Sequence, residues 1–550
     1  MARPRKIVAI DAETDPFLTG RIPKPFIWGC YDGKDQITFE ETKDLVEYLS
    51  TKRLLAYAHN GGKFDFMFLL PFIGETKCQI INGRIVSMFI GLCEFRDSFA
   101  IIPEPLRKFG AKKEIDYDKL EAPVRHLHME EIKEYLFYDC KILYDAVTQY
   151  RNIAGTRSTI ASNALSFARK LGIDPGKTNH TFDREMRNYY YGGRCECFQG
   201  GTHKNIKLVD IHSAYPAGMI QHHATGGEFI VQDDFRDMTR ADIERSFVKL
   251  ECTSHGAFPK RIGGQDGGLS FPHEFDLYYV TGWEYLAAKE LGLIENEKLI
   301  SVRWTQRTIT FKNYVTHWFE YKARHDKNID PVNYTIGKIM MNSLYGKLAQ
   351  NPAKYYDYKI VPAGTQVDFE NGWDLQLEYE GHEIHRRESL WKWKHNEGVA
   401  WKTKDLYKNV ATGASITGYV RAILLRAIHQ IGKENVIYCD TDGLVLSEKA
   451  DLSQIDIGNL IGQWGIDDEN APVGHFAGKK LYAVLQSDGK KKIASKGSKL
   501  DFDQLERIVN GETIQWSNPA PSFKIDGSAN FVVRNISATA KSFARKSKVN

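Results

Sequence analysis

The first 150 residues alternate short apolar runs with longer amphipathic stretches. Residues 7–10 are continuously apolar and predict a buried strand, and residues 54–58 predict another. Residues 129–150 repeat apolar side chains at helical spacing, with acids early and Arg151 just after, as the helix dipole favours. Alternating strands and helices are typical of α/β domains, so we expect one such domain here.

The rest of the chain continues as a mosaic of helical and strand-like segments without an internal repeat. Residues 313–349 predict two helices in a hairpin, because turn-forming residues interrupt the helical pattern at 328–331. Residues 354–402 are polar and β-rich. Further helices are predicted at 283–291 and 413–431, and an apolar strand at 436–439.

Length and composition indicate a globular protein of several domains. The 550 residues are 42% hydrophobic and 26% charged, which excludes bulk disorder. The longest strongly apolar stretch, 66–73, is far shorter than the roughly 20 residues that span a bilayer, so no membrane partner is expected. The basic start is followed by only four apolar residues, which argues against a secretion signal. The scattered cysteines lack metal-finger spacing, and we expect reduced thiols in a cytoplasm.

Positive charge gathers toward the C-terminus, although the net charge is only +4. Residues 476–500 hold seven Lys and one acid, Asp488, and the chain after Asp526 carries basic residues without acidic ones. This distribution suits a polyanionic partner such as nucleic acid, with a solvated lysine surface as the plain alternative.

Acidic and polar side chains follow both N-terminal strands. Asp11 and Glu13 are two positions apart, so they project from the same face of an extended chain. The polar segment after the second strand supplies further candidates, namely His59, Asn60, Phe64 and Asp65. Strand-end acids often only meet solvent, and an aspartate such as Asp65 often only caps a helix.

The helix predicted at 129–150 places Tyr135 and Asp139 one turn apart on one face. In isolation this is an ordinary amphipathic helix. Together, however, four acids in one α/β domain can hold two divalent ions, one activating water and one stabilising the leaving oxygen, while Tyr135 orients the nucleophile. The motifs resemble the DEDD-type 3′–5′ proofreading exonuclease of family B DNA polymerases, with its DxE, Nx2-3(F/Y)D and YxxxD motifs.

A second group of acids is spread over the C-terminal two thirds of the chain. A short strand delivers Asp210, followed by Tyr215 and a turn at Pro216. Asp440 and Asp442 lie in an Asp-Thr-Asp-Gly turn between two apolar strands, a strong hairpin signal. Such a tip is commonly just a turn, yet acids between apolar strands are also where a metal is held.

Lys338, Asn342 and Tyr345 form a polar stripe on one face of a predicted helix, at positions i, i+4 and i+7. Such a stripe usually faces solvent. The chemical alternative is that Lys338 neutralises an incoming triphosphate and Tyr345 packs on the nascent base pair.

These segments resemble the family B polymerase signatures: motif A (Dx2SxYP), motif B (Kx3NSxYG) and motif C (YxDTDS). Lys480 and Tyr482 look like the KxY primer-binding motif, and all four occur in the family's order over nearly the whole chain. Gly443 departs from the pattern, because motif C usually has Ser there. We expect altered hydrogen bonding at the turn rather than lost activity, since the carboxylates are retained.

Further features resemble the protein-primed branch, which includes phi29-like and tectivirus polymerases of bacteriophages and linear plasmids. Tyr190, Gly192 and Gly193 match its YxGG motif. About 100 residues separate motifs B and C, and the β-rich segment there is placed like the branch's second terminal-protein-region insertion. Residues 21–26 and 60–65 look especially like the tectivirus enzymes.

The resemblance implies an α/β and α+β multidomain fold, with an RNase H-like 3′–5′ exonuclease domain and a palm, fingers and thumb polymerase domain that holds two terminal-protein-region insertions. The expected domains are the exonuclease at 1–152, the first part of the palm at 153–225, the first insertion at 226–321, the fingers at 322–353, the second insertion at 354–403, the second part of the palm at 404–490 and the thumb at 491–550.

The resemblance also implies template-directed synthesis from dNTPs with two Mg²⁺ ions per active site, Mn²⁺ being an alternative. Asp210 and Asp442 would bind the polymerase ions, supported by Asp440, and Tyr215 would exclude a 2′-hydroxyl. The exonuclease ions would be held by Asp11, Glu13, Asp65 and Asp139. The remaining contacts would be those of Lys338, Asn342 and Tyr345 with the dNTP, and those of His59, Asn60, Phe64, Tyr190, Gly192, Gly193, Lys480 and Tyr482 with DNA.

The expected partners are primer-template DNA and a terminal protein whose hydroxyl starts synthesis of a linear viral or plasmid genome in the host cytoplasm. The second insertion would encircle the template and confer processivity and strand displacement. A stand-alone exonuclease with a nucleic-acid-binding C-terminal region is an alternative, but it leaves Asp210, Lys338 and Asp442 unexplained. A third possibility is a non-enzymatic DNA-binding protein, in which all seven carboxylates would be surface acids.

Overall fold

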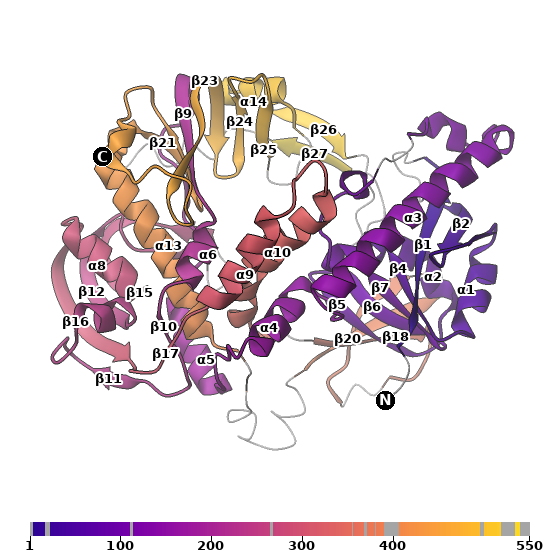
Figure 1. Cartoon of the computed structure of the whole chain (residues 1–550), viewed down its shortest axis with the longest axis horizontal. Helices are drawn as coiled ribbons and strands as arrows, with labels where there is room; N and C mark the ends of the chain where they lie inside the picture. The colour runs from indigo at the N-terminus through magenta and orange to yellow at the C-terminus, as the bar shows by residue number, and fades with distance from the viewer. Residues whose placement is uncertain are drawn as a thin grey trace.

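The computed structural model places an N-terminal α/β unit and a larger C-terminal part on either side of a central pair of helices (Figure 1). It describes residues 4–16, 23–110, 114–263, 268–354, 356–367, 371–379, 381–389, 406, 408–495, 500–518 and 534–538. Within these ranges no helix is both long and apolar enough to cross a lipid bilayer.

A ten-stranded mixed sheet forms the N-terminal unit, in the order β19-β20-β18-β5-β6-β7-β4-β1-β2-β3. At its centre, β1 (Lys6–Thr14), β4 (Leu54–Ala58) and β7 (Cys93–Asp97) are parallel. Consecutive residues of β1 are buried, so the strand is covered on both faces. It is longer than the predicted 7–10, because its pairing with β2 (Pro25–Tyr31) continues past Glu13.

Helix α3 (Met129–Ile153) covers one face of this sheet and confirms the helix predicted there. It approaches β2 closely at Gly29, where a Cβ would lie 2.9 Å from Leu136 Cγ and 3.0 Å from Cys140 Sγ. Glycine thus sets how deeply the helix sits on the sheet. The unit also contains β3 (Gln36–Phe39), α1 (Thr42–Ser50), α2 (Asp65–Leu69), β5 (Thr76–Ile81) and β6 (Arg84–Ile90).

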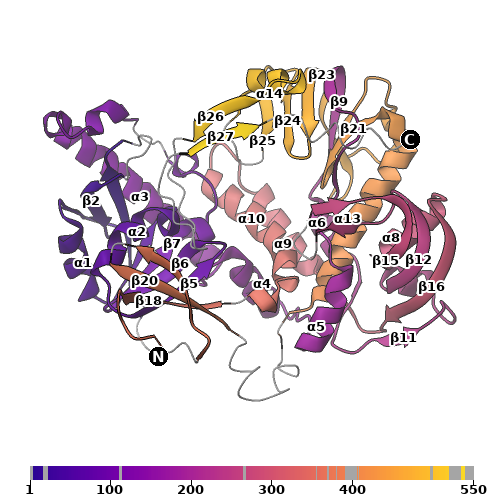
Figure 2. The same ribbon diagram turned by 180° about the vertical axis from the view of Figure 1, so that it is seen from behind.

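Three strands from much later in the chain extend the same sheet (Figure 2). β18 (Tyr356–Pro362) pairs with β5, and β20 (His382–Glu388) lies between β18 and β19 (Asp374–Tyr379). The β-rich prediction for 354–402 is confirmed for these strands, whereas 390–402 lies outside the described residues. The segment expected as the second insertion is therefore hydrogen-bonded to the N-terminal sheet.

A seven-stranded sheet, in the order β25-β24-β23-β9-β22-β21-β8, forms the core of the C-terminal part. Helix α13 (Val410–Ile431) packs on one face, with Val420, Leu424 and Ile428 against Val209 of β9. The strands of this seven-stranded sheet are β8 (Cys195–Cys197), β9 (Gly201–Ile211), β21 (Val436–Asp440), β22 (Gly443–Leu446), β23 (Trp464–Gly478), β24 (Leu481–Leu485) and β25 (Lys491–Ser495). The thumb boundary expected at 490/491 falls between two paired strands of this sheet.

A separate four-stranded antiparallel sheet lies where the first insertion is expected, in the order β11-β16-β12-β15. Its elements are β11 (Ile230–Gln232), α7 (Arg240–Glu244), β12 (Phe247–His255), β15 (His273–Thr281), α8 (Gly282–Glu290) and β16 (Ile294–Trp304). The expected boundary at 321/322 falls inside the next helix, α9 (Lys312–Ala323).

Helices α9 and α10 (Pro331–Leu348) form the predicted hairpin at the centre of the molecule (Figure 1). The buried Tyr314 hydroxyl of α9 donates a 2.6 Å hydrogen bond to the Met340 carbonyl of α10. The remaining elements are α4 (Ile160–Lys170), α5 (His180–Met186), α6 (Ala214–Met219), β10 (His223–Ala224), β13 (Lys260–Ile262), β14 (Gly268–Ser270), β17 (Thr308–Ile309), α14 (Phe502–Val509), β26 (Ile514–Asn518) and β27 (Arg534–Ala538).

Candidate active sites

Asp210, Asp440 and Asp442 come together at one end of the seven-stranded sheet. Asp440 ends β21, Asp442 follows in the turn, and β9 runs beside β22 with Asp210 opposite Gly443. The hairpin confirms the prediction made from the Asp-Gly sequence. All three aspartates, which we call the acidic cluster, line one cavity of about 340 Å³.

Burial and mutual repulsion make negative charge costly in the acidic cluster. Burial, followed by the charges of Asp210 and Asp440, raises the pKa of Asp442 to about 7. The pKa of Asp210 is also raised, first by burial and then by the charge of Asp467. Carboxylates in this situation attract a cation, so the cluster has the chemistry of a metal site.

Lys480 reaches the acidic cluster from the turn between β23 and β24 and forms an ion pair with Asp440. Its backbone N–H donates a 2.9 Å hydrogen bond to the Tyr438 hydroxyl. Tyr482 is buried, and its ring centroid lies 4.8 Å from that of Tyr438. The predicted primer-binding residues are thus anchored on strand β21 of the hairpin.

Tyr215 and Tyr345 stack beside the acidic cluster. Tyr215 lies in α6, directly after β9, and Tyr345 in α10. Burial, followed by the neighbouring Tyr190, raises the pKa of Tyr345 to about 12. The charge of Asp442 contributes to the raised pKa of both stacked tyrosines, so the pair lies within its electrostatic reach.

Lys338 and Asn342 share the Tyr345 face of α10, as their spacing predicts. The Asn342 side-chain amide donates a 2.8 Å hydrogen bond to the Lys338 carbonyl. Lys338 itself is exposed, which leaves its ammonium accessible to a ligand.

A buried arginine of α13 holds the segment 190–193 in place. Arg421 is 2% exposed and pairs with Glu284 of α8 through two bonds of 2.7 and 3.0 Å. Its third nitrogen donates to the carbonyls of Tyr191 and Gly192 at 2.7 and 2.8 Å. Sequence patterns gave no sign of this contact, because its members come from three distant segments.

The end of the same segment touches the acidic hairpin. A Cβ at Gly193 would come within 2.7 Å of the Thr441 side chain, so only glycine fits without a shift. The Thr441 backbone N–H donates a 2.7 Å hydrogen bond to the Arg194 carbonyl, and Thr441 has a left-handed φ of 66°. Together these contacts fix the turn that carries Asp440 and Asp442.

The N-terminal unit brings the other predicted acids together. Asp11 and Glu13 lie on β1, and Tyr135 and Asp139 lie on α3, which packs across that strand. Burial, with the charges of Asp139 and Glu13 as the next causes, raises the pKa of Tyr135. Asp11 adds to the same effect, so these four groups form one electrostatic neighbourhood.

Asp65 joins them from the start of α2, where it is 2% exposed. The Ala12 backbone N–H, between Asp11 and Glu13, donates to this carboxylate, while burial raises its pKa to about 7. Its Oδ1 atom is buried and has no hydrogen-bond partner in the described ranges. An unpartnered buried carboxylate oxygen beside other acids fits a bound cation.

Sequence reasoning missed Asp97, which is 1% exposed at the end of β7. It forms an ion pair with Arg84 and accepts hydrogen bonds from the backbone N–H groups of Gly62 at 3.2 Å and Phe99 at 2.9 Å. Asp97 thereby fixes the loop between β4 and α2. The available signal was a short segment of alternating apolar and charged residues, 93–97, that ends in an acid.

That loop carries the three residues predicted to contact single-stranded DNA. His59, Asn60 and Phe64 are each half-buried, and His59 Nδ1 lies 2.9 Å from Ser98 Oγ. Asn60 has a left-handed φ of 62°. They therefore border Asp65 with part of their surface open to a ligand.

Sequence reasoning also missed Asp467 of β23 and Lys492 of β25. Both line the cavity of the acidic cluster, and their side chains form a 3.4 Å ion pair. Both charges act on the pKa of Asp210. Only the strand order of the sheet brings them there.

Neither group is arranged as a finished metal site. In the part of the chain that the structure describes, no three Asp, Glu, His or Cys side chains are placed to hold one ion. In the acidic cluster, one reason is that the Asp440 carboxylate is already engaged in an ion pair with Lys480. The predicted ligands are thus neighbours, but no three of those described are arranged around one ion position.

Comparison with known proteins identifies the family. Residues 111–433 match the model of DNA polymerase type B, organellar and viral. The chain is 33% identical to the DNA-directed DNA polymerase of Enterobacteria phage PRD1, over 97% of this chain and 98% of that protein. This chain belongs to the type B DNA polymerases. The polymerase is therefore a DNA-directed enzyme, and the nuclease-only and non-enzymatic alternatives are set aside.

The fold of the polymerase agrees with this assignment. The DNA polymerase of Bacillus phage phi29 is 23% identical over 81% of this chain and 80% of that protein. A solved structure of phi29 DNA polymerase complexed with primer-template DNA matches with a TM-score of 0.75 at 19% identity, covering 98% of this chain and 100% of that one. The likeness confirms the predicted α/β and α+β multidomain fold class.

Proposed function

We propose that this polymerase replicates a linear viral or plasmid genome by protein-primed initiation and corrects its errors with a 3′–5′ exonuclease. The proposal for the site of DNA synthesis rests on the convergence of Asp210, Asp440 and Asp442 on one cavity. Protein priming rests on the resemblance of residues 190–193 to the YxGG motif and on the two segments placed as insertions.

Asp210 and Asp442 would hold two Mg²⁺ ions, or Mn²⁺, with Asp440 in support. Such ions lower the pKa of a primer hydroxyl and neutralise a leaving pyrophosphate. The fit rests on the donor set, because carboxylate oxygens suit these hard cations and a cation would relieve the repulsion that raises the pKa of Asp442 to about 7.

The neighbouring residues would select and orient the substrates. Tyr215, held flat by Tyr345, would lie beneath the dNTP sugar and exclude a 2′-hydroxyl, while Tyr345 supports the nascent base pair. Lys338, aligned with Asn342, would compensate the triphosphate charge. Lys480 would leave its ion pair with Asp440 and bind a phosphate of the primer strand. Tyr482 would contact the same DNA strand.

Asp11, Glu13, Asp65 and Asp139 would hold the exonuclease ions, and Tyr135 would orient the attacking water. The buried, unpartnered Oδ1 of Asp65 supports a cation there. A frayed primer end would stack and hydrogen-bond on the surface predicted for it, formed by His59, Asn60 and Phe64.

The main partner would be a terminal protein that offers a hydroxyl as primer, with primer-template DNA and dNTPs as substrates. We assign the sheet at 226–321 and the strands at 354–403 to the two insertions that receive it, and place the enzyme in the host cytoplasm. Tyr190, Gly192 and Gly193 would contact the DNA between the two active sites.

The test is dNMP transfer to a candidate terminal protein. The enzyme is incubated with that protein, linear DNA carrying the genome's end sequence, labelled dNTPs and Mg²⁺. We expect a covalent dNMP–protein product that Asp442→Asn abolishes. Extension of an ordinary DNA primer without any labelled protein would overturn protein priming and leave the polymerase assignment intact.

A further inference from the structure

The helix that carries the proposed nucleotide-binding residues is held from its buried side. Lys338 and Tyr345 share one face of α10, whereas Met340 follows Lys338 by two positions and so lies about 200° around the helix from it. Met340 is fully buried, and its carbonyl accepts a 2.6 Å hydrogen bond from the Tyr314 hydroxyl of α9. The side chain of Met340 is contacted by a second tyrosine, from a different part of the chain.

That second tyrosine belongs to α3, the helix that also carries Tyr135 and Asp139. The Tyr150 hydroxyl donates a 3.7 Å hydrogen bond to Met340 Sδ, and both residues are buried. They belong to one hydrophobic core that joins α3, α4, α9 and α10. A thioether sulfur is a weak acceptor, so the direction of this bond depends on what fixes the hydroxyl.

A buried asparagine of α4 fixes the Tyr150 hydroxyl. Asn163, 1% exposed, donates a 3.1 Å hydrogen bond to that oxygen. The Asn163 amide also donates a 3.1 Å bond to the Arg157 carbonyl and accepts one of 2.8 Å from the Arg157 backbone N–H. Because Asn163 supplies a proton to the hydroxyl oxygen, Tyr150 keeps its own proton for Met340.

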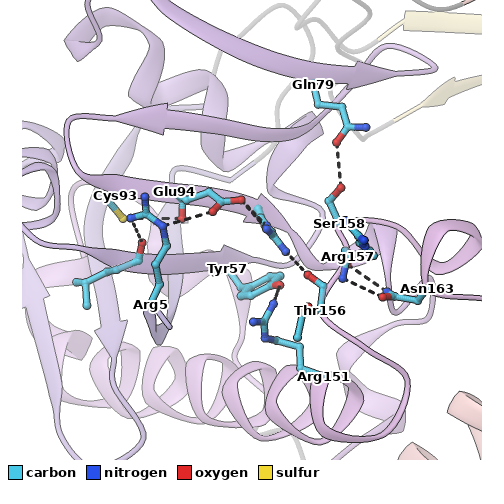
Figure 3. Close-up of polar contacts among 12 residues, drawn as sticks. Arg5, Tyr57, Gln79, Cys93, Glu94, Arg151, Thr156, Arg157, Ser158 and Asn163 are labelled. Carbon is cyan, nitrogen blue, oxygen red and sulfur yellow. Dashed lines mark hydrogen bonds and ion pairs between the residues drawn. The ribbon is translucent and has the colours of Figure 1, made fainter. Parts of the chain in front are cut away.

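The loop between α3 and α4, which orients Asn163, is hydrogen-bonded to the N-terminal sheet (Figure 3). Three bonds connect this loop and the end of α3 to strands β7, β5 and β4. They run from Arg96 to the Thr156 carbonyl at 2.8 Å, from Ser158 to Gln79 at 3.0 Å and from Arg151 to the Tyr57 hydroxyl at 3.1 Å. A chain of contacts therefore leads from the sheet through Asn163 and Tyr150 to Met340.

We propose that Tyr150, held by Asn163, is a positioning residue for DNA synthesis. It holds α10 by Met340 in the orientation in which the opposite face of the helix binds a dNTP. When only one orientation of a helix binds a ligand, the apparent affinity falls with the fraction of molecules in that orientation. The inference deepens the function proposed above and rests on it, because that function assigns dNTP contacts to α10.

The effect of this contact is expected on dNTP binding in particular. The acidic cluster and the predicted primer-binding residues Lys480 and Tyr482 belong to the seven-stranded sheet and its turns, which the chain of contacts from Asn163 to Met340 does not include. Loss of the Tyr150 hydroxyl should therefore weaken dNTP binding and leave the affinity for primer-template DNA unchanged.

Single-turnover incorporation of one nucleotide tests the inference with the full-length protein. Primer-template DNA and Mg²⁺ are mixed with each variant at increasing dNTP, which gives the maximal rate and the half-saturating dNTP concentration. Tyr150→Phe removes the hydroxyl and keeps the ring in the core. Tyr144→Phe is the matched control, because it removes a hydroxyl from the same helix where the ring packs against Tyr31 of β2.

We expect Tyr150→Phe to raise the half-saturating dNTP concentration about fivefold, the scale of one hydrogen bond, with the maximal rate within about twofold of the wild type. Tyr144→Phe should match the wild type. Met340→Leu removes the sulfur acceptor and should act like Tyr150→Phe. The double variant Tyr150→Phe/Met340→Leu should add little to either, since all three lack the same bond.

A purely structural role would give a different pattern. Partial unfolding removes active enzyme without changing how the folded molecules bind dNTP. A lower maximal rate at an unchanged half-saturating concentration in Tyr150→Phe would therefore overturn the inference. Fully additive effects of Tyr150→Phe and Met340→Leu would also overturn it, because they would show that the two residues act separately.

Lys338→Ala distinguishes failure of this inference from failure of the proposed function. If Lys338→Ala raises the half-saturating dNTP concentration and Tyr150→Phe does not, the positioning role alone is wrong. If neither variant raises it, α10 is not the nucleotide-binding helix, and the positioning role is wrong together with that assignment.

Discussion

The rings of Tyr215 and Tyr345 stack with centroids 4.1 Å apart and planes at 15°, although one belongs to α6 and the other to α10. The stack ties the segment that follows β9, the strand of Asp210, to the helix that carries Lys338. Movement of α10 therefore changes the surface on which an incoming nucleotide would rest.

Tyr215→Val should weaken discrimination against ribonucleotides. Removal of the ring opens space under the sugar, and we expect the dNTP to rNTP ratio of kcat/KM to fall by about 100-fold, the scale at which pocket shape rejects an added hydroxyl. Tyr345→Phe, which keeps the stack, is the matched control and should preserve the ratio. Single-nucleotide extension with both substrates measures it, and an unchanged ratio in Tyr215→Val would contradict the assignment.

The two acidic groups should be separable by mutation. Asp442→Asn is expected to remove about 4 kcal/mol of transition-state stabilisation, hence about a thousandfold of primer extension, while degradation of a 3′ end persists. Asp11→Ala with Glu13→Ala should do the reverse. Gel assays of one labelled primer, with and without dNTPs, follow both activities. Loss of both activities in either variant would disprove two independent sites.

Arg421→Met should strongly destabilise the protein, because it leaves Glu284 buried without its partner. The expected loss in the free energy of unfolding is about 3–5 kcal/mol. Arg426→Met is the matched control, since that residue of the same helix forms a partly exposed pair with Glu290, and it should cost at most about 1 kcal/mol. The double variant Arg421→Met/Glu284→Leu should recover part of the lost free energy of unfolding, which urea denaturation measures. Equal effects of the two single variants would count against a buried clamp.

His223 should make folding stability depend on pH. Its Nε2–H donates to the Gly218 carbonyl at 2.7 Å, its Nδ1 lies 2.8 Å from Ser415 Oγ, and burial lowers its pKa to about 4. Between pH 6.5 and about 4 the unfolded chain binds a proton that the folded chain excludes. The free energy of unfolding should therefore fall as pH drops through this window, by about 3 kcal/mol in total, and this contribution is fully present above pH 6.5.

Urea denaturation of the wild type and His223→Gln at several pH values isolates that contribution, because all other groups titrate in both. The stability difference between the two proteins should shrink steadily below pH 6.5. A constant difference across the range would show that His223 does not titrate differently on folding.

Gly443→Ser tests the departure from the usual motif C. A Cβ at this position would lie 3.2 Å from Asp210 Oδ2, a tight contact that a small shift relieves. A serine hydroxyl can also donate to that carboxylate, so primer extension should stay within about tenfold of the wild type, the scale of one hydrogen bond. Gly443→Val has no such donor and more bulk, and it should lose more. Equal losses in the two variants would indicate that backbone freedom, not space, requires glycine.

Local patterns predicted most of the elements and several acids of each candidate site, but they missed Asp97, Asp467 and Lys492. Periodicity and turn chemistry can be recognised within a short stretch of sequence. They predict the α9–α10 hairpin, the β21–β22 hairpin and the one-turn spacing of Tyr135 and Asp139. Contacts between distant segments cannot be recognised within a short stretch of sequence. They include the ion pairs of Arg421 with Glu284, Lys480 with Asp440, and Asp467 with Lys492. The pairing of β18 with β5 escaped prediction for the same reason.

That pairing has a consequence for engineering. With β18, β19 and β20 removed, β5 would become an outer strand with free backbone N–H and C=O groups along the side that now faces β18. Exposed edges of this kind recruit strands from other molecules. A shortened enzyme without residues 356–388 should therefore self-associate unless a charged or proline substitution in β5 protects the new edge.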